Sequence, residues 1–375
     1  MPIDPRTFYD ALSSLHLDFY AGVPDSLLKN FCACVTDRAP AGRHVVAANE
    51  GCAVAAACGY HVATGRIGVV YLQNSGIGNA VNPLLSLADC AVYAIPLLMI
   101  VGWRGEPGVH DEPQHMKQGR ATESLFEAME IESEVLSDEG WEDQLADIVS
   151  GMRKEPAPRA LVVRKGMFDS YPFIPADNGC PLTREQALET VLGAVPADSF
   201  VVSTTGKTSR EVFEIREARG SGHKRDFLTV GSMGHASSIA LGMSLGSRQP
   251  VWCIDGDGAM LMHLGALPVA AQVAGDNYKY IVNVNGAHES VGGQPTVGLD
   301  IDVPGVLRAC GFSIVETARS ESEVVEAMAA LSSADAPAAL VLYTRQGSRT
   351  DLGRPSLSPV ENKKLMMAAF DAARA

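Results

Sequence analysis

The sequence predicts an α/β protein that is built from two doubly wound parallel-sheet domains. Its 375 residues are too many for one ordinary hydrophobic core. Short apolar strands alternate with helical patterns along the chain, and the alternation restarts after a segment rich in Pro, Gly and Asp. Continuously apolar strands, such as IGVVYL and IPLLMIVG, are typical of a parallel sheet that helices cover on both faces.

The first half of the chain contains five expected strands and four expected helical patterns. The strands are expected near 17–21, 44–48, 67–73, 96–102 and 159–164, and the helices near 25–36, 51–63, 78–88 and 120–129. We expect these residues to form an N-terminal domain over 1–167, because the strand and helix patterns follow one another without a long interruption.

A linker is expected over 168–182, where proline, glycine and aspartate recur. The C-terminal domain is then expected over 183–375 and begins with a capped helix at TREQALETVL. Its strands are expected near 200–204, 227–231, 250–255, 278–284, 313–316 and 338–344, and its helices near 208–218, 235–246, 264–274, 302–310 and 321–332, with a terminal helix at the end. The short linker leaves no room for a middle domain.

Composition and charge limit the function classes. With 46% hydrophobic and 20% charged residues, the sequence is typical of a globular protein, and its net charge of −14 argues against a nucleic-acid or anionic-membrane surface. The N-terminus lacks the pattern of a signal peptide, and the apolar run at 94–101 is too short to span a bilayer. The eight cysteines form no CxxC pair, so we expect reduced core residues in a cytoplasmic protein.

A glycine-rich turn after an apolar strand predicts a metal and diphosphate site. In VWCIDGDGAM, Gly256 and Gly258 allow a bound group to approach the backbone, and Asp257 between them offers a carboxylate. A second strand, YKYIVNVNG, ends at Asn285. One carboxylate and one amide oxygen would leave room on Mg²⁺ for a diphosphate and water. The alternative is a tight turn at GDG with Asn285 as a cap.

These two strand ends resemble the signature of the thiamine-diphosphate enzymes. The family usually has two adjacent asparagines at the second strand end, whereas this chain has Val284 before Asn285. The resemblance implies that Mg²⁺ is bound by Asp257, Asn285 and the main-chain oxygen of Ala287. It also implies that the diphosphate lies near Thr205, Gly206, Gly256, Gly258, His288 and Ser290.

The other end of the cofactor would be held by two further segments. In HVVAANEGCAVAAACGY, Glu50 follows a strand, and the resemblance assigns it the hydrogen bond that activates the aminopyrimidine ring. The alternative is an acidic residue that favours a helix N-terminus. In LTVGSMGHASSIALG, Met233 matches the apolar residue that bends the cofactor, and Gly231 would accept from the pyrimidine amine. Met233 could instead fill the core.

Several segments resemble the phosphonopyruvate decarboxylases and their relatives, the sulfopyruvate decarboxylases. They are AGVPDSLLKNF, NEGCAVAAACGYHVATG, YLQNSGIGN, VGWRGEPGVHDEPQH and NGAHESVGGQPT. We expect Asp25 and His110 to transfer protons, and Arg104 and His115 to bind the phosphonate. Asp25 could instead cap a helix, and Arg104 could be a surface charge.

The resemblance implies a thiamine-diphosphate- and Mg²⁺-dependent lyase that converts 3-phosphonopyruvate to phosphonoacetaldehyde and CO₂ in phosphonate or antibiotic biosynthesis. Sulfopyruvate decarboxylation and carboligation are alternatives within this superfamily. A dehydrogenase with NAD on two Rossmann-like domains is disfavoured, because the chain has no GxGxxG loop. The family also implies an anionic 2-oxo acid as substrate and a homodimer, alone or within a tetramer, whose active sites lie at the subunit interface.

Overall fold

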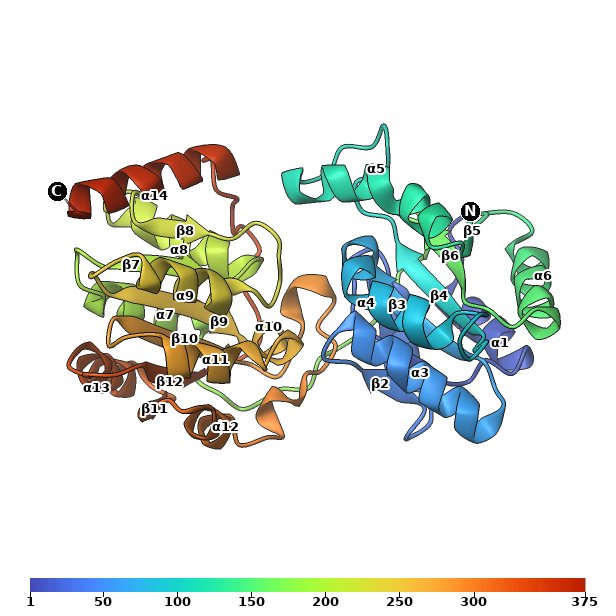
Figure 1. Cartoon of the computed structure of the whole chain (residues 1–375), viewed down its shortest axis with the longest axis horizontal. Helices are drawn as coiled ribbons and strands as arrows, with labels where there is room; N and C mark the ends of the chain where they lie inside the picture. Colours follow the sequence, from blue (N-terminus) through green and yellow to red (C-terminus); the bar gives the residue numbers. More distant parts are fainter. Residues whose placement is uncertain (375) are drawn as a thin grey trace. The chain divides into compact units, whose positions relative to one another are not determined.

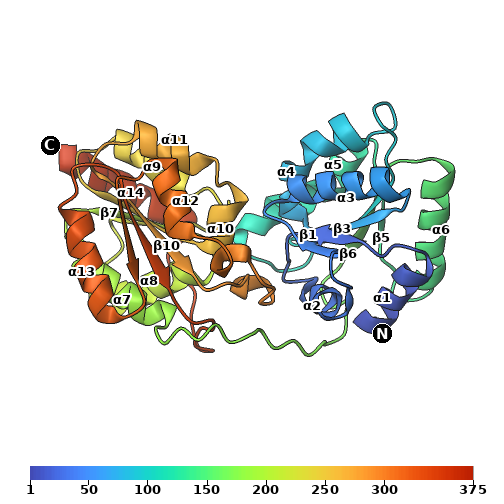
Figure 2. The ribbon, with the colours of Figure 1, turned by 90° about the horizontal axis from the view of Figure 1, so that it is seen from below.

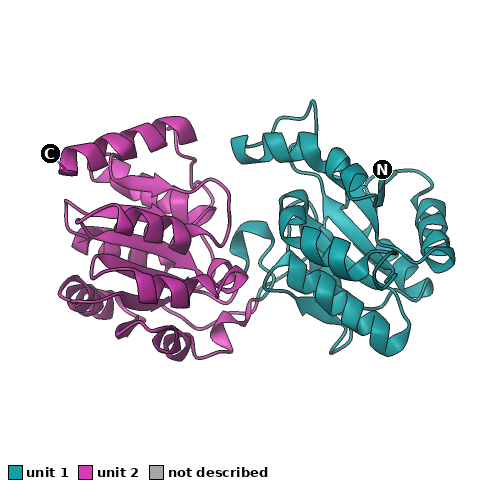
Figure 3. Cartoon of the chain, viewed as in Figure 1, with its two compact units in different colours: residues 1–175, 288–295 teal, residues 176–287, 296–375 magenta. Residues whose placement is uncertain are grey.

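The computed structural model describes residues 1–374, and these residues form two compact units (Figure 3). Unit 1 comprises Met1–Pro175 together with His288–Pro295. Unit 2 comprises Ala176–Ala287 and the residues from Thr296 onward. Each unit contains one six-stranded sheet in which every pair of neighbouring strands is parallel. The predicted α/β class with two doubly wound parallel sheets is therefore confirmed.

Unit 1 has the strand order β2-β1-β3-β4-β6-β5. Its strands are β1 (Tyr20–Gly22), β2 (His44–Val46), β3 (Gly68–Gln73), β4 (Leu97–Gly102), β5 (Glu132–Val135) and β6 (Arg159–Val163). Its helices are α1 (Pro5–Ser14), α2 (Lys29–Arg38), α3 (Glu50–Thr64), α4 (Ile77–Pro83), α5 (Pro113–Ala128) and α6 (Trp141–Lys154). The order reverses between β1 and β3, which is where ligands bind in doubly wound folds.

The sheet of unit 1 separates two hydrophobic cores. Helices α1, α2 and α6 cover one face, with Phe8, Phe31 and Trp141 among the packed side chains. Helices α3, α4 and α5 cover the other face, where small residues such as Ala53 let α3 approach the strands closely. The helices on the two faces are visible in Figures 1 and 2. Burial on both faces explains why the central strands β3 and β4 are almost continuously apolar.

Unit 2 has the order β11-β12-β10-β9-β7-β8, which repeats the topology of unit 1. Its strands are β7 (Phe200–Ser203), β8 (Asp226–Leu228), β9 (Val251–Gly256), β10 (Tyr278–Val284), β11 (Ile314–Ala318) and β12 (Ala338–Tyr343). Its helices are α7 (Arg184–Ala194), α8 (Lys207–Ala218), α9 (Ala236–Leu245), α10 (Asp257–Met262), α11 (Ala266–Val273), α12 (Val303–Cys310), α13 (Glu321–Ser332) and α14 (Pro359–Arg374). Strand β7 thus corresponds to β1, β8 to β2, β9 to β3 and β10 to β4.

The sheet of unit 2 is covered in the same way. Helices α7, α8 and α13 pack on one face around Trp252. Helices α9, α10, α11, α12 and α14 pack on the other, around Tyr278 and Tyr280. Helix α7 begins with a capping box in which Thr183 and Gln186 bond reciprocally. This cap confirms the predicted helix start at the beginning of the second half of the chain.

Some elements were not predicted from the sequence. Strand β5 reads ESEV and alternates between exposed and half-buried positions at the sheet edge, so it lacks the apolar pattern of central strands such as β3 and β4. Helices α1 and α6 were missed although α1 has Asp4 as its cap and Pro5 at its first position. The interpretation of the cysteines as core residues is wrong for Cys52 and Cys90, which are exposed.

The connection between the two sheets has no helix or strand over residues 169–181. The division between units falls inside this segment, at Pro175. Residues 288–295 group with unit 1, although the sequence places them within the expected C-terminal domain 183–375. No helix within residues 1–374 is long and apolar enough to cross a membrane.

Candidate active site

The carboxyl ends of four neighbouring strands carry the polar residues of unit 1. Asp25 follows β1, Glu50 follows β2, Asn74 follows β3 and Arg104 follows β4. Because these strands are parallel and adjacent, their carboxyl ends lie at one edge of the sheet. The fold therefore places three of the residues predicted for catalysis or substrate binding at this edge.

Glu50 is the first residue of α3, and its side chain is 5% exposed. The preceding Asn49 caps the helix by accepting a hydrogen bond from the Cys52 N–H at 2.9 Å. The Glu50 Oε2 accepts from the Asn79 Nδ2 at 2.7 Å. A Cβ atom at Gly76 would lie 2.2 Å from Glu50 Oε1, so the carboxyl fits only against a glycine. Glu50 is thus a buried carboxyl with a fixed orientation, as well as a helix-start acid.

Asp25 is fully buried in the turn between β1 and α2. Its Oδ2 accepts hydrogen bonds from the N–H groups of Leu27 at 2.9 Å and Leu28 at 3.3 Å, which hold the turn before α2. Asp25 is not the cap of that helix, because α2 begins at Lys29 and its N-cap is Leu28. Its Oδ1 has no partner within residues 1–374. Burial raises the pKa of Asp25 to about 6, although the backbone N–H of Leu27 and the charge of Arg104 oppose this. A carboxyl with this pKa is suited to proton transfer near neutral pH.

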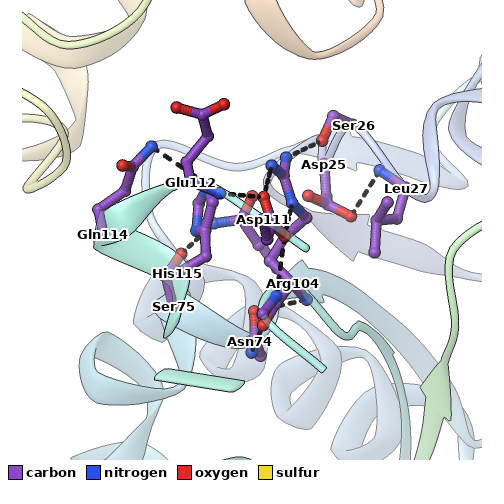
Figure 4. A network of polar contacts seen from close by, with 12 residues as sticks. Asp25, Ser26, Leu27, Asn74, Ser75, Arg104, Asp111, Glu112, Gln114 and His115 are labelled. Atoms are coloured by element: carbon purple, nitrogen blue, oxygen red, sulfur yellow. Dashed lines mark hydrogen bonds and ion pairs between the residues drawn. The ribbon is translucent and has the colours of Figure 1, made fainter. Parts of the chain in front are cut away.

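Arg104 is held by a network rather than exposed as a surface charge (Figure 4). Its guanidinium donates to both carboxylate oxygens of Asp111, with Nε at 2.7 Å from Oδ2, and its Nη1 donates to the Ser26 hydroxyl at 2.7 Å. Asn74 fixes its backbone, because the Asn74 Nδ2 donates to the Arg104 carbonyl at 2.8 Å. Asp111 and Asn74 were not predicted as site residues.

The two histidines of this region differ. His115, on α5, is buried, and its Nδ1 has no partner within residues 1–374. Burial, together with the charge of Arg104, lowers the pKa of His115 to about 4. The imidazole is therefore neutral at neutral pH and can bind an anion by a hydrogen bond but not by charge. His110 is exposed on the loop between β4 and α5, and the structure gives it no hydrogen bond within the described chain.

In unit 2, hydrogen bonds connect the turns that carry Asp257 and Asn285. Asp257 is the first residue of α10, and its Oδ2 accepts from the Gly286 N–H at 2.9 Å and the Thr296 hydroxyl at 2.6 Å. The Asn285 Oδ1 accepts from the Ala287 N–H at 3.0 Å. Both side chains are 3% exposed. The supporting role of Thr296 was not predicted, because Thr296 lies beyond the strand ends in the sequence.

The residues present fit the metal and diphosphate that the sequence predicts. Asp257 and Asn285 supply a carboxylate and an amide oxygen, which are the hard donors that Mg²⁺ prefers. A Cβ atom at Gly298 would lie 2.5 Å from Asp257 Oδ2, so a glycine is needed beside the carboxylate. A Cβ atom at Gly256 would meet no heavy atom within 4 Å, which leaves space for a group to approach the backbone of this turn.

The other predicted cofactor residues of unit 2 also follow strand ends. Thr205 and Gly206 follow β7, and Gly231 and Met233 lie between β8 and α9. Met233 is half-buried and belongs to neither hydrophobic core of unit 2. His288 and Ser290 belong to the segment 288–295, which groups with unit 1. Burial lowers the pKa of His288 to about 4.

Comparison with known proteins identifies the family. The N-terminal thiamine pyrophosphate binding domain model matches residues 6–125, and the C-terminal one matches residues 204–342. The phosphonopyruvate decarboxylase of Streptomyces viridochromogenes is 35% identical over 370 residues, which cover 93% of this chain and 90% of that protein. The chain belongs to the phosphonopyruvate decarboxylase family of thiamine pyrophosphate enzymes. Members of this family are carbon–carbon lyases, and thiamine-diphosphate-dependent decarboxylation is thus the reaction class of the chain.

The relatives of the phosphonopyruvate decarboxylase family include sulfopyruvate decarboxylases. The protein of Methanosarcina acetivorans with that name is 26% identical over 335 residues, which cover 83% of both chains. Methanothermobacter thermautotrophicus has separate subunits: alpha is 37% identical over 33% of this chain, and beta is 36% identical over 36% of it. The expected absence of a middle domain agrees with this two-domain family.

Proposed function

We propose that the protein decarboxylates 3-phosphonopyruvate to phosphonoacetaldehyde and CO₂, with thiamine diphosphate and Mg²⁺, as a cytoplasmic enzyme of phosphonate or antibiotic biosynthesis. The 35% identity over nearly the whole chain to a phosphonopyruvate decarboxylase supports this substrate most strongly. The sulfopyruvate decarboxylase of Methanosarcina acetivorans is less similar, at 26% identity.

Unit 2 would hold the metal and the charged end of the cofactor. Mg²⁺ would bind to the side chains of Asp257 and Asn285 and to the main-chain oxygen of Ala287. The diphosphate would lie against Gly256 and Gly258, where the turn is open, and against Thr205, Gly206, His288 and Ser290. The residues of 183–375 would thus form the diphosphate-binding domain, joined by the linker 168–182 to a pyrimidine-binding domain over 1–167.

The reactive end of the cofactor would be oriented by Glu50, Gly231 and Met233. When it is bound, thiamine diphosphate supplies an electron sink for the electron pair that remains when CO₂ leaves. Glu50 would hold a proton at Oε1, because Asn79 already donates to Oε2 at 2.7 Å. Met233 would set the bend of the cofactor, and the carbonyl of Gly231 would accept from its amine.

The substrate would be bound and protonated by residues at the carboxyl edge of unit 1. Asp25 would move a proton at its unpartnered Oδ1, and its pKa of about 6 supports this role. His110 would serve as the second proton carrier from its exposed loop. Arg104 and the neutral His115 would donate hydrogen bonds to the phosphonate oxygens.

The substrate assignment is tested with purified protein, thiamine diphosphate and Mg²⁺. Phosphonopyruvate, sulfopyruvate and pyruvate are supplied separately, and CO₂ release and aldehyde formation are measured. We expect the highest kcat/KM for phosphonopyruvate. Faster turnover of sulfopyruvate would show that the protein is a sulfopyruvate decarboxylase instead. A coupled hydroxyketone in place of an aldehyde would identify a carboligase.

We also propose a homodimer, alone or within a tetramer, whose active sites combine unit 1 of one subunit with unit 2 of another. The family resemblance supports this arrangement. Glu50→Gln and Asp257→Ala proteins, each inactive, are mixed under conditions that exchange subunits. Activity should reappear, because the mixed dimer contains one site with both residues intact. No recovery, despite subunit exchange shown by mass spectrometry, would exclude shared sites.

A further inference from the structure

The guanidinium of Arg104 is only partly occupied by the protein. An arginine side chain has five N–H groups. In Arg104, one at Nε and one at Nη2 donate to Asp111, and one at Nη1 donates to Ser26. The structure gives no partner within residues 1–374 to the other two. Two directional donors therefore remain for a ligand at the carboxyl edge of unit 1.

The carboxylate of Asp111, by contrast, is fully used. Besides the two bonds from Arg104, its Oδ2 accepts from the Gly105 N–H at 2.8 Å and its Oδ1 accepts from the Glu112 N–H at 2.7 Å. Although burial alone raises it, the hydrogen bonds from Arg104 and the backbone lower the pKa of Asp111 well below its usual range. Asp111 thus stays charged and has no free oxygen for a substrate.

The loop that carries Asp111 is fixed against α5. Gly105 has a φ of +70°, and a Cβ atom there would lie 2.0 Å from the carbonyl oxygen of His115. Asp111 closes this loop by binding both the side chain of Arg104 and the N–H of Gly105. The two parallel hydrogen bonds between Arg104 and Asp111 hold the plane of the guanidinium in one orientation.

Buried polar atoms without partners mark this network as a ligand site. Asp25 Oδ1, Gln114 Oε1 and His115 Nδ1 are buried and have no hydrogen-bond partner within residues 1–374. All three residues belong to the group around Arg104 that Figure 4 shows. Buried polar atoms are almost always satisfied in folded proteins, so three exceptions in one network indicate a polar ligand.

We propose that Asp111 is a positioning residue, which orients Arg104 so that the two remaining N–H groups of the guanidinium bind the phosphonate of the substrate. This inference rests on the proposed function. Because Asp111 also neutralises Arg104, the phosphonate is recognised by the direction of the N–H groups rather than by net charge. Asp111 itself does not contact the substrate.

The test uses the full chain with thiamine diphosphate and Mg²⁺. Asp111→Asn removes one of the paired oxygens and the charge, and we expect the KM for phosphonopyruvate to rise roughly 10- to 100-fold. The kcat should stay within about threefold, since Asp111 touches no reacting atom. Asp111→Glu retains both oxygens and should recover part of the lost affinity.

Two further variants separate positioning from general damage. Arg104→Met should raise KM at least as much as Asp111→Asn, and the double variant should be no worse than Arg104→Met, because the two residues act as one unit. Glu132→Gln breaks the Glu132–Arg159 ion pair of the same unit and should change neither constant. A fall in kcat at unchanged KM, or additive effects in the double variant, would overturn the proposal.

A binding measurement keeps this inference separate from the proposed function. Phosphonoacetate has no keto group and is not turned over, so its Kd is measured by calorimetry on wild type and Asp111→Asn. A Kd increase of roughly 10- to 100-fold supports the positioning role even if wild type does not decarboxylate phosphonopyruvate, which would refute only the function. An equal Kd for both proteins refutes the positioning role.

Discussion

Units 1 and 2 share one topology but carry different chemistry at the same strand ends. After β1 and β2, unit 1 has Asp25 and Glu50, whereas unit 2 has small residues and Met233 after β7 and β8. After β4, unit 1 has Arg104, whereas Asn285 follows the corresponding β10. The sheets supply the positions, and the residues at their carboxyl ends determine what each unit can bind.

The two edges also differ in how much space they leave. In unit 1, a Cβ atom at Gly102, the last residue of β4, would lie 2.1 Å from the Asp25 Oδ2, so side chains fill the edge. In unit 2, a Cβ atom at Gly256 would meet nothing within 4 Å. A crowded edge of acids and a guanidinium suits proton transfer and substrate recognition, whereas an open glycine turn suits a large polar group that binds to the backbone.

Of the residues that distinguish the two units, Asp257 should have the largest effect on activity. Asp257→Ala removes the only carboxylate of the proposed Mg²⁺ ligands, and we expect activity to fall by roughly 10³-fold or more, with loss of thiamine diphosphate binding. Calorimetric titration with the cofactor and Mg²⁺ measures this. Asp302→Ala, which removes the cap of α12 in the same unit, is the control and should bind normally. Unchanged cofactor affinity in Asp257→Ala would refute the metal assignment.

Glu50→Gln should affect the reaction rather than the affinity for the cofactor. Glutamine retains the acceptor for Asn79 but cannot exchange the proton, so kcat should fall roughly 10²- to 10⁴-fold. The Kd for thiamine diphosphate, measured by the same titration, should change by less than about tenfold. If cofactor binding were lost as completely as in Asp257→Ala, Glu50 would be a binding residue and the division of labour between the units would fail.

Asp25→Asn should lower activity but stabilise the protein at high pH. Since burial raises the pKa of Asp25 from 3.8 to about 6, the folded protein retains this proton more tightly than the unfolded chain. Stability is therefore lost as the pH rises from about 4 to about 6, by roughly 3 kcal/mol at most. The asparagine side chain does not titrate, so the Asp25→Asn variant does not lose this stability. The difference in Tm between the variant and wild type should therefore increase from about pH 4 to about pH 6 and then stay constant. An advantage that is the same at pH 4 and pH 8 would contradict the raised pKa.

Gly256→Ala should have the smallest effect on the fold. The open space and the φ of −123° accept a methyl group, so the free energy of unfolding should change by less than about 0.5 kcal/mol. The methyl group would occupy space that the diphosphate needs, and the Kd for thiamine diphosphate should rise by roughly tenfold. Gly242→Ala, in α9 with equal space around its Cβ atom, is the matched control and should leave the Kd unchanged.

The elements that could be predicted from the sequence are those with local signals. Buried parallel strands are mostly apolar, and polar residues follow them directly, so the sequence predicts Glu50, Asp257 and Asn285 at strand ends, where the structure has them. Edge strand β5 has no such signal, because half of its positions are exposed. The alternation of strands and helices was visible, but the identical order of the two sheets depends on long-range pairing.

The supporting residues could not be predicted in the same way. Asn74, Asp111 and Thr296 act through hydrogen bonds whose partners are fixed only by the folded chain. The neutral state of His115 likewise depends on its burial, which the sequence does not reveal. Asp111 had a partial signal, because its loop contains one arginine among several acids, and that pattern favours an internal ion pair.

Each unit has its own complete sheet between two cores, and the segment 169–181 that connects them has no regular structure. Neither sheet needs a strand from the other unit in order to fold. A continuous chain through the segment 169–181 is therefore not required for the folding of either unit. If the gene were divided within this segment, the two halves could be expressed as separate polypeptides that then assemble. In Methanothermobacter thermautotrophicus, sulfopyruvate decarboxylase has separate alpha and beta subunits, which match 33% and 36% of this chain.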